Sequence, residues 1–305
     1  MGSLVGDAIV AGLGVGSIYA VIAMGYTLIL GASGVFNFAQ GSAVMAGALV
    51  SYGLGTVEHV PVLVIVGAVM ATGAVTGLIT HAIAVLPLTH RTGITNLTFG
   101  TFLSTLGVGL VFNSIISLAF GDANVYPVRF YVSQASINVL GLHIRPIYLV
   151  MFLSTVALVA IFEFVNRATS AGLVMRAVFN DVEGAALAGI SISRVVRRVF
   201  VVGCLLAALA GFLVAPLTFA QTGIANQYAF YGFAAMAIGG YGSFAGAIVG
   251  GLLVGLVGEI PLIWVSPDLS GALIYGAMLL LLLLRPQGIF GSGGSAFGAA
   301  AVRDV

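Results

Sequence analysis

Apolar segments recur along the whole chain and are separated by short polar breaks. A helix of about 20 residues crosses the hydrocarbon core of a bilayer. The pattern predicts helices near residues 8–30, 37–56, 61–86, 95–120, 146–165, 198–220, 227–241, 244–263 and 268–285. The seventh is short, and the sequence leaves open whether residues 221–241 span fully. We therefore predict an all-α, polytopic membrane fold with about eight to nine transmembrane helices, some of them broken or half-length.

The distribution of arginine orients these segments, because cytoplasmic loops retain positive charge. Five arginines lie within 166–198, Arg91 precedes the fourth segment, and Arg285 follows the last. Two predicted spans separate Arg91 from Arg167, and four separate Arg198 from Arg285, so all these sites can lie on one side. We expect the N-terminus outside and the C-terminus inside. Loop 121–145 then lies outside despite its two arginines, and its composition predicts a strand pair or an interfacial helix.

Composition agrees with this interpretation. Hydrophobic residues make up 60% of the 305 positions and charged residues 6%, whereas soluble domains average about a quarter charged. Mean hydropathy is +1.19. No polar block is large enough to fold separately in water, so residues 1–305 are predicted to form a single transmembrane domain. The first apolar segment lacks a basic leader region and a cleavage site, and we expect it to be retained.

Several chemistries are excluded by the residues that are missing. All ten basic residues are arginines, so the chain has no lysine for a phosphate-binding loop or a Schiff base. The four histidines are isolated and form no metal-ligand pair. The single cysteine, Cys204, lies in an apolar run and is interpreted as a buried packing residue. We expect no catalytic residue, no metal site and no cofactor in this chain.

Carboxylates deep in the predicted spans are nearly absent. Glu163 lies near the end of its span, where it can pair with Arg167 at i, i+4 spacing, and Glu259 lies near the outer end of another span. Ion-coupled carriers usually need buried carboxylates or an ion cage at the membrane midplane. The energy source for transport is therefore expected to lie outside this chain.

Glycine is abundant, at 43 of 305 residues. Small residues recur every four positions as Ala8, Gly12, Gly16 and Ala20, and as Gly242, Gly246 and Gly250. Such rows let helices approach closely in lipid, where hydrophobicity alone gives no drive to associate. We predict that these glycines serve helix packing.

The polar residues within the predicted spans are uncharged. In "GASGVFNFAQGSAVMAGALV", residues 31–50, Asn37 and Gln40 follow glycines that can interrupt a helix, and i, i+3 spacing would place them on one helical face. Non-helical backbone at membrane depth must be buried in protein or line a polar cavity. We predict a neutral substrate pathway lined by Asn37, Gln40, Asn113 and Gln221. The alternative, that the amides only bond neighbouring helices, stays open. Other polar residues in spans are Asn96, Thr98, Ser104, Asn226 and Gln227.

Segment 166–198 is the most charged part of the chain and is long enough to dock a partner. Asp181 can cap a short helix at its N-terminus, and Gly189 or the following "ISIS" would end that helix. Val182, Ala185, Ala186 and Gly189 would lie along one side of it. A small apolar face with a basic rim suits a groove on another protein. A solvated loop that only obeys the positive-inside rule is the alternative.

The stretch "MRAVFNDVEGAALAGISISRV" resembles the cytoplasmic loop of permease subunits from ATP-binding-cassette (ABC) importers of the branched-chain amino-acid type. The positions that match are Arg176, Asp181, Glu183, Ala186, Gly189 and Ile190. "GYTLILGASGVFNFAQGSAVMAGA", "IGGYGSFAGAIVGGLLVG" and "RPQGIFG" resemble the same family in the same order. The chain departs at Gln40, where related permeases often have histidine; the position keeps a hydrogen-bonding side chain but loses its titratable character.

The resemblance implies a multi-pass permease subunit in the bacterial inner membrane, translocating branched-chain or related amino acids. It implies a second permease chain, identical or related, an external substrate-binding protein, and two cytoplasmic ATPases that hold ATP and Mg. No nucleic acid partner is implied. A helix near 172–189 would transmit ATPase closure. Urea, short amides or aromatic carboxylates are alternative substrates. A stand-alone channel or ion-coupled carrier for small polar solutes is the alternative from another class.

Overall fold

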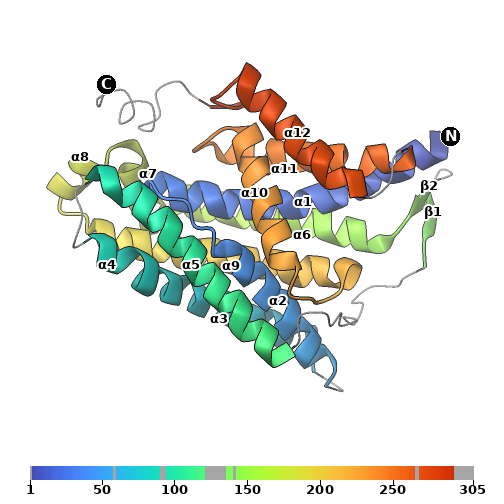
Figure 1. The fold of residues 1–305 in the computed structure, drawn as a ribbon, viewed down its shortest axis with the longest axis horizontal. Coiled ribbons are helices and arrows are strands. Elements are labelled where there is room, and N and C mark those ends of the chain that lie inside the picture. The colour runs from blue at the N-terminus through green and yellow to red at the C-terminus, as the bar shows by residue number, and fades with distance from the viewer. Residues whose placement is uncertain are drawn as a thin grey trace. The chain divides into compact units, whose positions relative to one another are not determined.

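A computed structural model describes residues 2–57, 60–89, 94–120, 135–139, 142–264 and 268–291, most of them helical (Figure 1). Six helices in this part of the chain are long and apolar enough to cross a membrane. They are Leu4–Ser33, Val62–Leu88, Gly100–Phe120, Pro146–Ala168, Ile192–Thr218 and Phe244–Ile263. A shorter apolar helix covers Leu269–Leu284. The protein is therefore a multi-pass helical membrane protein.

Every apolar segment predicted from the sequence forms a helix. These helices are α1 (Gly2–Ser33), α2 (Gln40–Gly55), α3 (Val62–Thr80), α5 (Ile94–Phe120), α6 (Pro146–Ala168), α9 (Ile192–Thr218), α10 (Ile224–Gly239), α11 (Phe244–Glu259) and α12 (Asp268–Leu284). A π-helical turn (His81–Val85) and α4 (Leu86–Thr89) continue α3, and a 3-10 turn (Ile260–Ile263) follows α11. Helices α2 and α10 have 16 residues each, fewer than a full crossing needs. The number of complete crossings and the orientation of the chain stay predictions.

The chain divides into two compact units. The first unit takes in Met1–Thr27, Phe130–Thr155 and Phe230–Val305, and the second unit takes in Leu28–Arg129 and Val156–Ala229. Each unit is built around helices that approach through glycine.

In the first unit, the predicted small-residue row of α1 meets α11, but at Gly251 and Gly255 and not at the row predicted for that segment. A Cβ atom added at Gly251 would lie 2.3 Å from the backbone nitrogen of Ala20, and one added at Gly255 would lie 2.2 Å from the carbonyl oxygen of Gly12. The row of α1 therefore serves close packing as predicted, and Gly246 and Gly250 do so against α10, where added Cβ atoms would lie 2.4 Å from the carbonyl oxygen of Gly239 and 2.0 Å from that of Ala235. Gly242 is an exception, because it lies in the turn before α11 with a φ of +80° and has open space where a Cβ would stand.

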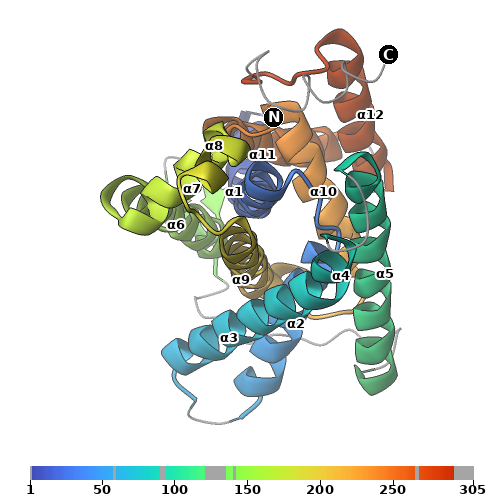
Figure 2. The ribbon, with the colours of Figure 1, turned by 90° about the vertical axis from the view of Figure 1, so that its left-hand side faces the viewer.

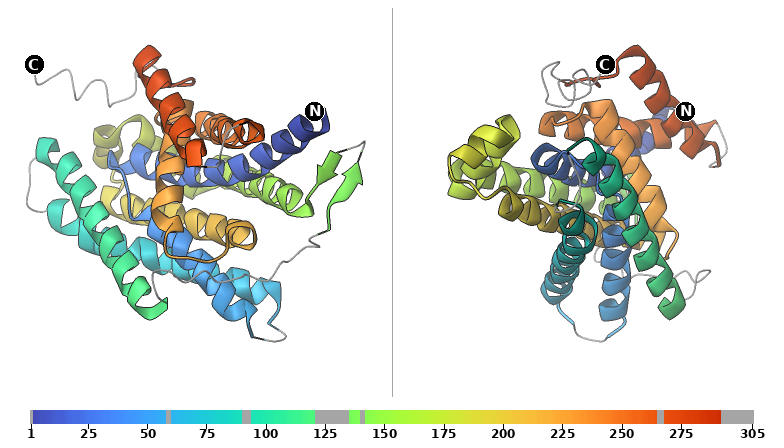
Figure 3. Two further views of the ribbon diagram at one scale, coloured as in Figure 1. Left: turned by 45° about the vertical axis from the view of Figure 1, so that its right-hand side comes forward. Right: turned by 60° about the vertical axis from the view of Figure 1, so that its left-hand side comes forward.

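A β-hairpin belongs to the same unit and is visible in the left view of Figure 3. Strands β1 (Ile137–Val139) and β2 (Leu142–Ile144) pair antiparallel, with Asn138 opposite His143. The backbone nitrogen of His143 donates to Asp7 Oδ1 at 2.8 Å, which fastens the hairpin to the start of α1. The strand pair expected within loop 121–145 is thus confirmed for its last part. Residues 121–134, like Arg91, lie outside the described residues.

In the second unit, α2, α3 and α9 pack against one another (Figure 2). A Cβ atom at Gly47 would lie 2.1 Å from the carbonyl oxygen of Ala208, and one at Gly211 would lie 1.9 Å from that of Val44. The backbones of α2 and α9 are therefore in direct contact. This packing fixes the position of the chain just before α2, where the uncharged polar residues lie.

Candidate functional site

The chain breaks between α1 and α2, as the glycines of "GASG" predict. Helix α1 ends at Ser33, and residues 34–39 form no helix before α2 begins at Gln40. Gly34 has a φ of +67°, a conformation that side chains with a Cβ rarely adopt. Ser33 Oγ donates to the Ile29 carbonyl oxygen at 2.6 Å and accepts from the backbone nitrogen of Val35 at 3.3 Å. These bonds close the end of α1.

Asn37 and Gln40 do not share a helical face, so this part of the prediction is wrong. Asn37 lies in the break, and Gln40 is the first residue of α2. Both side chains nevertheless reach the same part of α9. Asn37 Nδ2 donates to Cys204 Sγ at 3.5 Å, and Gln40 Nε2 donates to the Gly203 carbonyl oxygen at 3.5 Å. Both are fully buried, so in this structure they join α9 to the break.

The break is held on its other side by α5, through a residue that the sequence analysis missed. Thr105 Oγ1 accepts from the backbone nitrogen of Phe38 at 3.3 Å and lies 3.2 Å from the carbonyl oxygen of Phe36. Asn37 Oδ1 accepts from the backbone nitrogen of Ala39 at 3.2 Å. The available signal was the four-residue spacing of Thr101, Thr105, Gly109 and Asn113, which places small and polar residues along one side of α5.

Asn113, on α5, lies beside Ser42 in the first turn of α2. Ser42 Oγ lies 3.1 Å from Asn113 Oδ1 and 3.2 Å from the carbonyl oxygen of Gly109. These residues and Asn226 line a cavity of about 30 Å³ between α2, α5 and the start of α10. That volume is about the share of a single water molecule. In this structure the polar cluster is therefore packed too closely to hold an amino acid.

Gln221 is not brought to this cluster by any described contact. It lies after the end of α9, where its Nε2 donates to the Thr218 carbonyl oxygen at 3.5 Å. Its place in a pathway stays a prediction. The side chains of Asn96 and Thr98 lie outside the described residues.

The charged segment 166–198 folds into two helices, so the expectation of one helix near 172–189 is wrong. Helix α7 covers Ser170–Asn180 and α8 covers Val182–Leu187. Asp181 separates them with an extended backbone, and its Oδ1 accepts from the Gly184 nitrogen at 3.0 Å. This is the N-cap predicted from the sequence. A carboxylate at a helix N-terminus also complements the helix dipole.

Helix α8 ends in a Schellman motif. Gly189 has a φ of +83°, its nitrogen donates to the Ala186 carbonyl oxygen at 3.0 Å, and the Ile190 nitrogen donates to that of Ala185 at 3.0 Å. Gly189 therefore ends the helix as predicted. With both ends capped, this short helix is held in a defined shape.

The two faces of α8 differ from the expected single small-residue face. Ala185 packs inward with 5% of its surface exposed, while Val182 is 45% and Leu187 91% exposed. Glu183 is also exposed. Leu187 was missed from the sequence, although a leucine in the last turn of a capped helix was the available signal. Arg176 lies exposed on α7 and forms no ion pair with the part of the chain that the structure describes.

Helix α7 contacts α1 just before the break. The Phe179 ring lies over Gly31, where an added Cβ atom would be 2.7 Å from Cε2 and 2.8 Å from Cζ. The neighbouring Val178 is fully buried. The same helix that leads into α8 thus touches α1 three residues before Gly34. Glu163 and Arg167 form the predicted ion pair at the end of α6.

Comparison with known proteins extends these observations. A family model described as "branched-chain amino acid transport system / permease component" matches residues 8–283. The chain is 29% identical to the high-affinity branched-chain amino acid transport system permease protein LivH of Escherichia coli K12, over 92% of this chain and 93% of the relative. It is 28% identical to the corresponding BraD protein of Pseudomonas aeruginosa, over 93% and 94% of the two chains.

An archaeal relative is more distant. The probable branched-chain amino acid transport permease protein LivH of Methanocaldococcus jannaschii is 25% identical, over 89% of this chain and 88% of the relative. No solved structure matches this chain significantly. The family match includes the helix break, the polar cluster and helices α7 and α8. The chain therefore belongs to the family of permease components of branched-chain amino acid transport systems.

Proposed function

We propose that this chain is the permease subunit of an ATP-driven importer that takes up branched-chain or closely related amino acids through the bacterial inner membrane. The family and the relatives named above support this substrate class. The observation that carries the ATP-driven mechanism is α8, a doubly capped helix that presents Val182 and Leu187 outward from a basic segment.

In this proposal, α8 enters a groove on a cytoplasmic ABC ATPase that binds ATP and Mg. Leu187 supplies apolar contact area, because its side chain is almost fully exposed in the isolated chain. The Asp181 cap and the Gly189 turn hold α8 in shape, so that little conformational entropy is lost on docking. Exposed Arg176 and Glu183 add polar contacts at the edge of this interface.

The contact between Phe179 and Gly31 couples docking of α8 to the membrane part of the chain, because it joins α7 to α1. Movement of α7 would shift the end of α1 and thereby the break at residues 34–39. Opening of α9 away from the break would free Asn37 and Gln40 from Cys204 and Gly203, and the two amides would then line the pathway. A second permease subunit completes the pathway, and an external binding protein delivers the substrate.

The test is uptake of radiolabelled leucine into vesicles that contain the full assembly. We expect uptake to require ATP and the ATPase subunits. Leu187→Ala is expected to lower both uptake and co-purification of the ATPase about tenfold, because it removes the exposed apolar contact of α8. Leu283→Ala on α12 is the matched control. Leu283 is 83% exposed, close to the 91% of Leu187, but it lies far from segment 166–198 in the sequence.

Uptake that persists without ATP would refute the importer mechanism. Flux through the purified chain alone would favour a self-sufficient channel instead. A binding protein that holds urea, a short amide or an aromatic carboxylate would change the substrate and leave the mechanism in place.

A further inference from the structure

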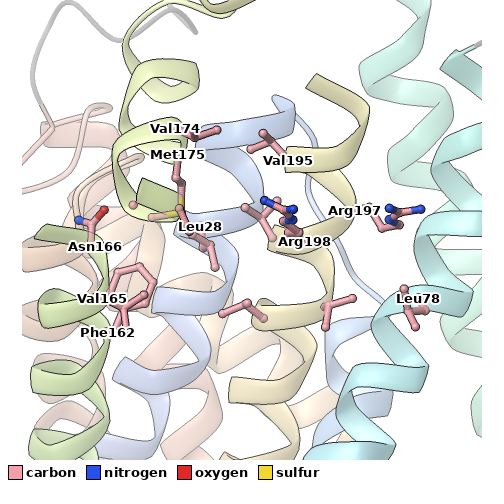
Figure 4. Close-up of a pocket in the computed structure, with 15 residues that line it drawn as sticks. Leu28, Leu78, Phe162, Val165, Asn166, Val174, Met175, Val195, Arg197 and Arg198 are labelled. Carbon is pink, nitrogen blue, oxygen red and sulfur yellow. The ribbon is translucent and has the colours of Figure 1, made fainter. Parts of the chain in front are cut away.

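An apolar cavity of about 460 Å³ lies in the second unit beside the charged segment (Figure 4). Its walls come from the last turns of α1, α3 and α6, from α7, and from the first turns of α9. Apolar side chains such as Leu28, Phe162 and Met175 line most of it. In Figure 4, Asn166 lies at one side of the cavity, and Arg197 and Arg198 lie toward the other.

A smaller hollow of about 250 Å³ adjoins this cavity and shares Val174, Val195 and Arg198 with it. Its other lining residues include Arg194 and Ser191. Arginines 194, 197 and 198 are exposed and stand at i, i+3 and i+4 on α9. They form no ion pair with any described residue of the chain. An apolar compartment and a compartment of uncompensated positive charge therefore lie side by side and share part of their lining.

We propose that this site binds one anionic phospholipid, with an acyl chain in the apolar cavity and the phosphate in the hollow between Arg194 and Arg198. Arginine suits this role, since its guanidinium group can donate two parallel hydrogen bonds to a phosphate. Each methylene of the acyl chain that enters the cavity adds to binding by leaving water. A free phosphate ion would leave the apolar compartment unfilled, and an uncharged lipid would leave the arginines without a counter-charge.

The depth of the site favours a lipid over an extended polypeptide segment. Leu78, Val165 and Val201 of the lining lie within helices long enough to cross a membrane. An extended peptide at that depth would bury backbone groups without hydrogen-bond partners, which is strongly unfavourable. Because the site borders the arginine-rich segment, the lipid belongs to the cytoplasmic leaflet. This assignment of the leaflet rests on the orientation in the proposed function.

Asn166 lines the apolar cavity on the side away from the arginines (Figure 4). Its Oδ1 atom has no hydrogen-bond partner within the described residues, but it is fully buried, so a headgroup held at Arg194 and Arg198 does not reach it. The headgroup is therefore chosen by charge alone. Phosphatidylglycerol carries one net negative charge and is the probe of choice.

The test uses the full transporter assembly, purified in detergent and incubated with phosphatidylglycerol or phosphatidylcholine. Native mass spectrometry then measures the lipid that stays bound. We expect retention of phosphatidylglycerol over phosphatidylcholine, and at least a tenfold loss of that preference in the double variant Arg194→Gln/Arg198→Gln. Arg285→Gln removes one exposed arginine charge at the end of α12 and is the matched control for Arg194→Gln and Arg198→Gln made singly.

A second variant addresses the acyl compartment without changing charge. Val165→Trp fills the cavity from α6, where Val165 is 43% exposed, and is expected to lower retention of both lipids. Equal retention of the two lipids by the unaltered assembly would overturn the proposal. Unchanged lipid retention in both the double arginine variant and Val165→Trp would also overturn it. A crosslink that places a helix of the second permease inside the cavity would do the same. Since this readout needs no ATP, it stands apart from failure of the proposed transport mechanism.

Discussion

Replacing Gly31 by alanine is expected to uncouple ATP hydrolysis from uptake. The new Cβ atom would lie 2.7, 2.8 and 3.0 Å from Cε2, Cζ and Cδ2 of Phe179. Non-bonded carbon atoms prefer separations of about 3.5–4.0 Å, so the ring would have to withdraw by about 0.5–1 Å. The ring sits at the end of a rotatable side chain on α7. The change therefore displaces α7 from α1 and leaves the backbone of the membrane helices in place.

The magnitude follows from two opposing terms. Overpacking of this kind costs about 1–3 kcal/mol. Within a helix, alanine is favoured over glycine by about 0.5–1 kcal/mol, so global stability changes little. The helix propensity of alanine does not favour docking of α7, because α1 is helical in both the docked and the undocked state. The overpacking cost therefore acts on docking in full. A cost of 1–3 kcal/mol corresponds to about a 5- to 150-fold fall in the equilibrium constant for docking of α7, and in the docked fraction where that constant is near or below one.

The measurement is leucine imported per ATP hydrolysed by the reconstituted assembly. We expect Gly31→Ala to lower this ratio by a factor within that range while the protein is still produced and folded. Phe179→Leu should restore much of the ratio in the Gly31→Ala background, because the smaller side chain leaves room for the methyl group. Gly53→Ala is the control, since a Cβ atom at Gly53 meets nothing within 4 Å.

A coupling ratio unchanged by Gly31→Ala would refute this reasoning. Failure of Phe179→Leu to relieve the defect would show that the methyl group acts elsewhere. The two single variants and the double variant form a cycle that isolates the contact between the two residues.

Three further outcomes are expected. Gly189→Ala should weaken binding of the ATPase about tenfold, because the left-handed backbone costs a residue with a Cβ about 1–2 kcal/mol. Gly189→Asn should be tolerated better. The affinity for the purified ATPase, measured for both variants, checks this. Gly211→Ala should lower the free energy of unfolding by about 3 kcal/mol relative to Gly53→Ala, because its Cβ would stand 1.9 Å from a backbone oxygen of α2; denaturation in detergent measures it. Asn37→Leu should cost about 1–3 kcal/mol of stability and reduce uptake, because it leaves the buried nitrogen of Ala39 without its acceptor.

Each of these expectations has a clear contrary result. Equal ATPase affinity for alanine and asparagine at position 189 would show that the αL turn is unimportant for docking. Equal stability of the alanine variants at positions 211 and 53 would mean that α2 and α9 are not in backbone contact. If leucine at both 37 and 40 left uptake and assembly unaltered, the two amides would be ordinary packing residues.

Local features of the sequence were enough to predict the membrane class, the helices and the ends of α8. Long apolar runs predict helices, because backbone groups in lipid must be satisfied within the segment. The Asp181 cap and the Gly189 turn depend only on residues within one helical turn. The small-residue rows of α1 and α11 likewise predicted close packing. Resemblance in four stretches identified the family, which the comparison confirmed over residues 8–283.

The polar site was predicted less completely, because its contacts join distant parts of the chain. Asn37 and Gln40 were singled out correctly as buried polar residues, but their spacing suggested a shared helical face that the break removes. Thr105 was missed, since the four-residue spacing of small and polar residues along α5 does not show that this side of the helix meets the break. Leu187 was missed because only the packing of Ala185 decides which side of α8 faces outward.

The sequence by itself therefore determined which segments are apolar helices, where the chain breaks and which family it belongs to. Only the tertiary structure decided that Asn37 and Gln40 form hydrogen bonds to α9. It also decided that Phe179 packs on Gly31 and that an apolar cavity lies beside the arginines of α9. The physical reason is that helices which are apolar on all sides carry no amphipathic stripe to show which face is inside. Their partners are set by where backbones can approach and where the few polar groups find each other.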